Sequence, residues 1–306
     1  MPAPVAKTKH RISARRAYIV ANVIRTKERQ MITDEQIQFW DDYGYLKYGK
    51  VLEQGEVTGL FEGFDRVARI ESGGGDNSSV EFSVGHARGA KDAEYEAGGI
   101  RQYVNLWKRD EAYNEMVRHP LITGITKKLL KTPELRLWHD HIISKPPKEN
   151  DRFQFHQDFY NWPLADPNIL TCWIALDDAT VANGCMHVVP GSHRDPRFSP
   201  AGRKKELEEL AKNPDARTER VIMGEHEANF GVPVELKSGE CMFHHSLNFH
   251  STPKNTTTGQ RRAFVIIYMP EGILFNNSQA WDHILVPNIE AKHGEPIAGS
   301  NFPVVG

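Results

Sequence analysis

The chain has few cysteines, no long apolar run and almost no net charge, and each of these absences narrows its function. Three cysteines in 306 residues, without a Cys-x-x-Cys spacing, argue against a disulfide framework and favour a cytoplasmic protein. No apolar stretch approaches the ~18 residues of a membrane span, and no signal-peptide core is visible. A net charge of −2 provides no broad positive field for nucleic acid or an anionic membrane. We therefore expect a small-molecule substrate, whereas the composition leaves the oligomeric state open.

Acidic residues are absent from the first 27 residues, which contain seven lysines and arginines. Organellar transit peptides, disordered basic arms and segments upstream of a start at Met31 share this composition. We expect residues 1–30 to form a flexible basic arm. Residues 31–306 are expected to form one domain, because all-β domains of this length often fold as a single unit.

Helical patterns occupy the first half of this domain. Thr33 and Gln36 have capping-box spacing and predict a helix that ends at Gly44. Apolar spacing predicts a second helix over residues 54–70, followed by an irregular, partly mobile loop over residues 71–98. A third helical region over residues 111–130 is broken near Pro120. We expect these helices to brace a sheet.

From residue 134 onward the pattern changes to short β-rich runs separated by turns, which is typical of a sandwich or barrel. The expected strands cover residues 135–144, 152–156, 169–176, 185–189, 233–236, 241–244 and 262–269. Asn183 and Gly184 are a hairpin-turn signal between two of them. A polar insertion near residues 196–230, with a short helix over residues 204–212, could serve as a lid or form a plain surface loop.

The candidate metal ligands are a His-x-Asp pair and a distant histidine. His156 and Asp158 are two positions apart, and side chains i and i+2 of a strand share a face. Three later histidines, His244, His245 and His250, compete for the third position. Two neutral imidazoles plus one carboxylate suit non-haem Fe(II) that acts on dioxygen. A lone His-x-Asp can also be a surface pair, so the flanking sequence is needed to distinguish a metal-ligand pair from a surface pair.

Five motifs surround these residues: FHQDFYNWPL at 155–164, TCWIALDD at 171–178, NGCM at 183–186, VPGSHR at 189–194 and SGECMFHHSLNFH at 238–250. Their order resembles the phytanoyl-CoA dioxygenase family of Fe(II)- and 2-oxoglutarate-dependent oxygenases, from about Met31 to the C-terminus. The resemblance implies a mainly β fold, a double-stranded β-helix of the jelly-roll, cupin-like kind, braced by N-terminal helices. It also implies Fe(II), 2-oxoglutarate and O₂, with iron ligands His156, Asp158 and His250.

The choice of His250 depends on an arginine further along the chain. The family places its cosubstrate arginine eleven residues after the distal ligand, and Arg261 stands eleven residues after His250, whereas Thr256 holds that position for His245. A guanidinium binds a carboxylate through two parallel hydrogen bonds, so Arg261 can hold the far carboxylate of 2-oxoglutarate. Arg262 is expected to point to the opposite face of the strand as a surface or structural charge.

Further candidates lie around the expected cosubstrate. Thr252 matches a position from which family members often offer a hydroxyl to the same carboxylate. His141 stands where the family commonly has a glutamine, and it either bonds the cosubstrate or joins a buried network. Trp173 is expected beside the cosubstrate, although aromatic residues at such positions usually fill the core. Tyr160 and Trp162 would share the face of the ligand carboxylate if the strand continued, which makes them candidates for the substrate pocket.

The expected reaction is hydroxylation of a small organic substrate, coupled to conversion of 2-oxoglutarate and O₂ into succinate and CO₂. Halogenating relatives lack the ligand carboxylate, and this chain retains Asp158. Desaturation or ring closure could follow the same hydrogen abstraction. The alternatives are a non-catalytic jelly-roll binding protein and a cupin-type metalloenzyme without 2-oxoglutarate. No segment selects among acyl-CoA thioesters, amino acids and natural-product intermediates as the substrate.

Overall fold

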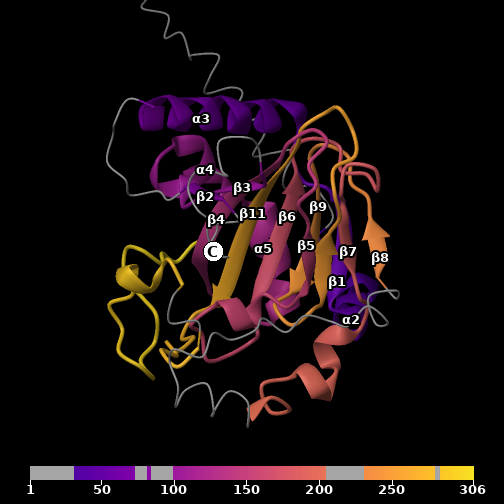
Figure 1. Cartoon of the computed structure of the whole chain (residues 1–306). Coiled ribbons are helices and arrows are strands. Elements are labelled where there is room, and N and C mark those ends of the chain that lie inside the picture. Colours follow the sequence, from indigo (N-terminus) through magenta and orange to yellow (C-terminus); the bar gives the residue numbers. More distant parts are fainter. Residues whose placement is uncertain (1–30, 73–80, 84–98, 205–230, 280–282) are drawn as a thin grey trace, which may run out of the picture.

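The computed structural model describes residues 31–72, 81–83, 99–204, 231–279 and 283–306. Within them two antiparallel sheets face each other as a jelly roll, which confirms the expected fold class (Figure 1). The larger sheet has the strand order β1 (Tyr45–Lys50), β9 (Glu240–His245), β6 (Leu170–Ala175), β11 (Arg261–Pro270), β4 (Leu135–Lys145), β3 (Arg101–Val104) and β2 (Glu81–Ser83). The smaller sheet has the order β5 (Phe153–His156), β10 (His250–Thr252), β7 (Met186–Val188) and β8 (Val232–Val234).

The first helix forms where the capping signals predict it. In α2 (Asp34–Tyr43) the Thr33 hydroxyl accepts the backbone N–H of Gln36 at 3.3 Å, and the Gln36 side chain accepts that of Thr33 at 2.9 Å. Gly44 ends the helix with a φ of 71°, a backbone conformation that glycine adopts without steric cost. The described residues also form the α-helices α3 (Gln54–Ser72), α4 (Glu111–Met116) and α5 (Pro120–Leu130), so the predicted break at Pro120 is confirmed.

Side-chain alternation along β11 separates two apolar cores. The outer residues pack with the helices, α5 among them, behind the larger sheet, and the inner ones pack between the two sheets (Figure 1). The outer set is Phe264, Ile266 and Tyr268, and the inner set is Ala263, Val265 and Ile267. Arg261 has the spacing of the inner set. Its side chain is therefore directed into the interior of the jelly roll.

The turn at Asn183 and Gly184 is present, but the hairpin prediction is wrong. Strand β6 lies in the larger sheet and β7 in the smaller one, so the turn belongs to a crossing between sheets. Gly184 has a φ of 80°, and a Cβ there would collide with the carbonyl of Pro253. Gly184 has the positive φ that such a turn uses, whereas Asn183 does not, and the local signal carried no information about which strands pair.

Several expectations fall wholly or partly outside the described residues. The basic arm at residues 1–30 lies outside them, as do most of the predicted helix over residues 204–212 and most of the segment 71–98. The described part of that segment includes β2, which pairs with β3, so an irregular loop is wrong there. None of the helices that the structure describes is long and apolar enough to cross a membrane.

Candidate active site

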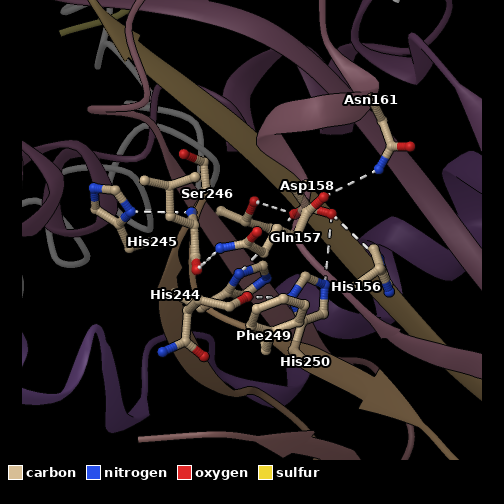
Figure 2. Close-up of polar contacts among 12 residues, drawn as sticks. His156, Gln157, Asp158, Asn161, His244, His245, Ser246, Phe249 and His250 are labelled. Atoms are coloured by element: carbon tan, nitrogen blue, oxygen red, sulfur yellow. Dashed lines mark hydrogen bonds and ion pairs between the residues drawn. The ribbon is translucent and has the colours of Figure 1, made fainter. Parts of the chain in front are cut away.

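Two paired strands bring the distant histidines together. His156 at the end of β5 is the direct cross-strand partner of His250 in β10, and their ring centroids are 4.3 Å apart. Asp158 Oδ1 lies 3.4 Å from Nε2 of His156 and 3.5 Å from Nε2 of His250. Figure 2 shows the three side chains pointing toward one another. Their ligand atoms all lie within 4.8 Å of one another, so one metal ion can contact all three.

Backbone carbonyls determine which nitrogen of each imidazole is free. Nδ1 of His156 lies 2.7 Å from the carbonyl oxygen of Gln154, and Nδ1 of His250 lies 3.0 Å from that of Asn248. A carbonyl only accepts, so Nδ1 donates in both rings and Nε2 is the nitrogen left to bind a metal ion. Hydrogen bonds of this kind orient histidine ligands in metal sites.

The protonation states also suit a metal ion. Burial lowers the pKa of His250 well below its ordinary value, which keeps the ring neutral. Burial by itself would raise the pKa of Asp158. The surrounding histidines His250, His156 and His244 lower this pKa by more than burial raises it, so the carboxylate stays ionised. Neutral imidazoles and an ionised carboxylate are the forms that bind a metal.

Asp158 does not lie on the strand that carries His156, so the basis on which the pair was predicted is wrong. Strand β5 ends at His156, and Asp158 has helical backbone angles, φ −64° and ψ −40°, at the start of a short 3-10 helix (Phe159–Asn161). The Gln157 side chain donates to the carbonyl of Leu247 at 2.6 Å, which anchors the turn. A turn, and not strand alternation, therefore brings the carboxylate beside the imidazole.

Two residues that were not predicted as site residues approach the other oxygen of Asp158. The Thr171 hydroxyl donates to Oδ2 at 3.2 Å, and Nδ1 of His244 lies 4.0 Å from the same oxygen. Thr171 and His244 are cross-strand partners in β6 and β9. His245 points away from Asp158 in Figure 2 and packs on Trp40, at 6.1 Å between ring centroids. Alternation along β9 is the sequence signal that could have separated the two histidines.

Arg261 is a buried cation inside the jelly roll. It has no solvent exposure, and none of its three guanidinium nitrogens has a hydrogen-bond partner among the residues that the structure describes. Burial lowers its pKa to about 10, so the group stays cationic at neutral pH. Burying an unpaired cation costs a large free energy unless an anion lies in contact with it. Arg262 lies on the opposite face and binds Asp177 at 2.8 and 2.9 Å, as expected of a structural charge.

Lys145 lies beside this cation and is hydrogen-bonded to Thr252. Lys145 is the direct cross-strand partner of Arg261 and is fully buried. Its Nζ donates to the backbone oxygen and to the hydroxyl of Thr252, both at 3.2 Å, and to the carbonyl of Pro253. Lys145 was not predicted as a site residue, because nothing in the local sequence indicates which residue β4 places opposite Arg261.

We expect Lys145 to make the unfolding free energy of the metal-free protein rise with pH above about 7. Burial, together with Arg261, lowers the pKa of Lys145 from 10.5 to about 7, although Glu149 and Asp151 raise it. Between these values the unfolded chain binds more protons than the folded chain, so a higher pH favours folding; below them the contribution is constant. Urea unfolding from about pH 6.5 to about pH 9.5 measures the difference in the free energy of unfolding between the wild type and Lys145→Met at each pH. A difference that is flat with pH would contradict this expectation.

His141 belongs to a buried histidine pair. Its Nδ1 lies 3.3 Å from Nδ1 of His139, and the two rings lie 5.2 Å apart. Burial lowers the pKa of His139 to about 4 and that of His141 well below its ordinary value, so both rings are neutral. The buried-network alternative for His141 is therefore present in the structure, and a bond from His141 to the cosubstrate stays a prediction.

The three aromatic candidates are all buried in the inner core. Trp173 lies on β6 with its ring 5.4 Å from Cζ of Arg261, and its indole Nε1 has no hydrogen-bond partner within the described ranges. Tyr160 and Trp162 follow the turn at Asp158, so their expected placement along a continuing strand is wrong. The Tyr160 hydroxyl donates to the carbonyl of Phe198 at 2.8 Å. A role for Tyr160 and Trp162 in the substrate pocket stays a prediction.

The jelly roll, the His-Asp-His cluster and the unpaired inner arginine define the class of iron- and 2-oxoglutarate-dependent oxygenases. Comparison with known proteins identifies the family. Residues 40–263 match the phytanoyl-CoA dioxygenase (PhyH) family, and the chain belongs to it. It is accordingly an oxygenase that uses iron, 2-oxoglutarate and O₂.

Curated relatives and solved structures agree with this membership. A probable phytanoyl-CoA dioxygenase of Caenorhabditis elegans is 26% identical over 255 residues, which are 79% of this chain and 77% of that protein. A methylphosphonate hydroxylase of Gimesia maris is 25% identical over 273 residues, 87% of this chain and 92% of that protein. The α-ketoglutarate-dependent carbocyclase SnoK of nogalamycin biosynthesis has a TM-score of 0.67 at 26% identity, over 90% of this chain and 97% of that chain.

Proposed function

We propose that this oxygenase hydroxylates a C–H bond of a small organic substrate, with His156, Asp158 and His250 as iron ligands and Arg261 as the cosubstrate clamp. The buried guanidinium of Arg261 carries this proposal, because it has no hydrogen-bond partner in the described part of the chain. The far carboxylate of 2-oxoglutarate would satisfy both its charge and its donors.

The bound iron, together with 2-oxoglutarate and O₂, supplies an oxidant able to remove hydrogen from a C–H bond, with release of succinate and CO₂. The residues of the chain position the reactants. Asp158 directs Oδ1 toward the two imidazoles while Thr171 holds Oδ2. Apolar side chains between the sheets exclude water, which strengthens the attraction between Arg261 and a carboxylate.

The alternatives explain these observations less well. A non-catalytic binding protein has no need for two imidazoles whose Nε2 atoms face one carboxylate. A cupin-type enzyme without 2-oxoglutarate leaves the buried charge of Arg261 without an anion. The net charge of −2 supports a small-molecule substrate over nucleic acid or a membrane surface. Three buried free cysteines support a reducing cytoplasm.

An anaerobic titration tests the proposal. Fe(II) and 2-oxoglutarate added to the protein should produce the weak visible charge-transfer band of the chelate, and admission of air should produce succinate. Candidate substrates include the compounds that appear in the names of its relatives, among them phytanoyl-CoA and methylphosphonate. Mass spectrometry separates hydroxylation, which adds an oxygen atom, from desaturation or ring closure, which removes two hydrogen atoms. Absence of both the band and succinate would refute the proposal.

A further inference from the structure

We infer that Lys145 is a positioning residue for the cosubstrate. Its ammonium donates a hydrogen bond to the Thr252 hydroxyl oxygen. The single proton of this hydroxyl is then directed to the carboxylate held by Arg261. The inference rests on the proposed function, because it requires 2-oxoglutarate at Arg261. It concerns a lysine that, among the described residues, donates to Thr252 and Pro253, so its effect on the cosubstrate would pass through Thr252.

The strand register places two cations side by side. Lys145 in β4 and Arg261 in β11 are direct partners in the antiparallel ladder, so their side chains leave the sheet on the same inner face. Both are fully buried. The register therefore places Lys145 beside the guanidinium that would hold the carboxylate.

All donors of the Lys145 ammonium have acceptors at the end of β10. An ammonium group has three N–H donors, and Nζ contacts three oxygens: the backbone and hydroxyl oxygens of Thr252 and the carbonyl of Pro253. These bonds link β4 of the larger sheet to β10 of the smaller one. Lys145 thus has no donor left for a ligand, and its influence on the cosubstrate passes through Thr252.

The Thr252 hydroxyl then has a single role available. A hydroxyl has one donor hydrogen and two acceptor lone pairs, and one lone pair receives Lys145. The hydrogen needs an acceptor, because Thr252 is itself buried. A carboxylate at Arg261 provides that acceptor. Without Lys145 the hydroxyl could rotate and donate to a backbone carbonyl, and the carboxylate would lose a hydrogen bond.

A purely structural role for Lys145 makes different predictions. A residue that only joins the two sheets would lower stability when removed, and its effect would not depend on the Thr252 hydroxyl. Asn255 offers a matched control, because its buried side chain donates to the backbone oxygens of Lys145, Pro146 and Gly259. Asn255→Ala should loosen the same strand end without removing any bond to the Thr252 hydroxyl.

The experiment is a double-mutant cycle on the dissociation constant of 2-oxoglutarate, read from the anaerobic charge-transfer band. Lys145→Met and Thr252→Val should each weaken cosubstrate binding by about 10-fold or more, the loss of one charge-assisted hydrogen bond. The double variant should bind 2-oxoglutarate with the affinity of the weaker-binding single variant, because both changes remove the same hydrogen bond from the Thr252 hydroxyl to the carboxylate. Fe(II) affinity should stay unchanged in all three, and Asn255→Ala should lower the melting temperature while keeping wild-type cosubstrate affinity.

The outcomes separate this inference from the proposed function. If the wild type binds no 2-oxoglutarate, the proposed function fails and this inference fails with it. If the wild type binds and Lys145→Met binds equally well, only the role of Lys145 is refuted. If the losses of 2-oxoglutarate affinity in the two single variants multiply in the double variant, Lys145 acts independently of Thr252, which also overturns the inference. Should Lys145→Met not fold, Lys145→Leu, which also removes the donor to the Thr252 hydroxyl, takes its place in the cycle.

Discussion

Asp158→Ala is expected to abolish substrate hydroxylation. It should also weaken Fe(II) binding more than loss of the hydrogen bond from Thr171 to Asp158 does. Asp158 is the only anionic member of the ligand cluster, and its Oδ1 faces Nε2 of both His156 and His250. Removing a hydrogen-bond partner of a ligand already costs about 10-fold to 100-fold in metal affinity. Anaerobic competition with a chelator measures Fe(II) affinity, and mass spectrometry measures the hydroxylated product.

Thr171→Val is the matched control for this change. It removes the hydrogen bond to Oδ2 of Asp158 but leaves all three ligand atoms in place. Its loss of Fe(II) affinity should stay within about 10-fold to 100-fold. Unchanged turnover in Asp158→Ala, or equal losses in the two variants, would refute the assignment of Asp158 as a ligand.

Arg261→Met is expected to change cosubstrate binding and protein stability in opposite directions. The loss of two charge-assisted hydrogen bonds should weaken 2-oxoglutarate binding by about 100-fold or more. The metal-free variant should be more stable than the wild type, because a buried cation without a hydrogen-bond partner is removed and an apolar chain of similar length replaces it. The charge-transfer band measures the affinity, and urea unfolding without metal or cosubstrate measures the stability.

The neighbouring arginine provides the control. Arg262 binds Asp177 through two hydrogen bonds on the outer face of the same strand. Arg262→Met should lower the free energy of unfolding, because it leaves Asp177 without its partner, and should leave the affinity for 2-oxoglutarate at the wild-type level. If Arg261→Met destabilises the metal-free protein as Arg262→Met does, the inner guanidinium has a partner of its own and is not waiting for a carboxylate.

Local structure was predictable from short segments. The capping box at Thr33 and the break at Pro120 depend on atoms within a few residues of each other, so the sequence contains the whole cause. Seven strands of the two sheets likewise occur close to the predicted ranges, but β1, β2, β3 and β10, the strand of His250, were not predicted. The choice of His250 among three histidines agrees with the cluster in the structure, although it depended on family spacing and not on physical reasoning about the strand.

The errors occurred where the chain changes direction. Strand alternation was extended through Asp158, but the chain turns there because Gln157 is anchored to the carbonyl of Leu247, 90 positions away. The turn at Gly184 was assigned to a hairpin, but its two strands pair with partners in different sheets. In both cases the deciding contact was made by residues far away in the sequence.

The sequence by itself determined the kinds of ligand, the inward direction of Arg261 and the positions of most helices and strands, because these depend on residue chemistry and on the periodicity of neighbouring residues. Only the tertiary structure decided which residues meet across strands: His156 with His250, Thr171 with His244, and Lys145 with Arg261. Register depends on the packing of both sheets and shifts every contact when it moves by one residue. The second cation beside Arg261 therefore became visible only in the folded protein.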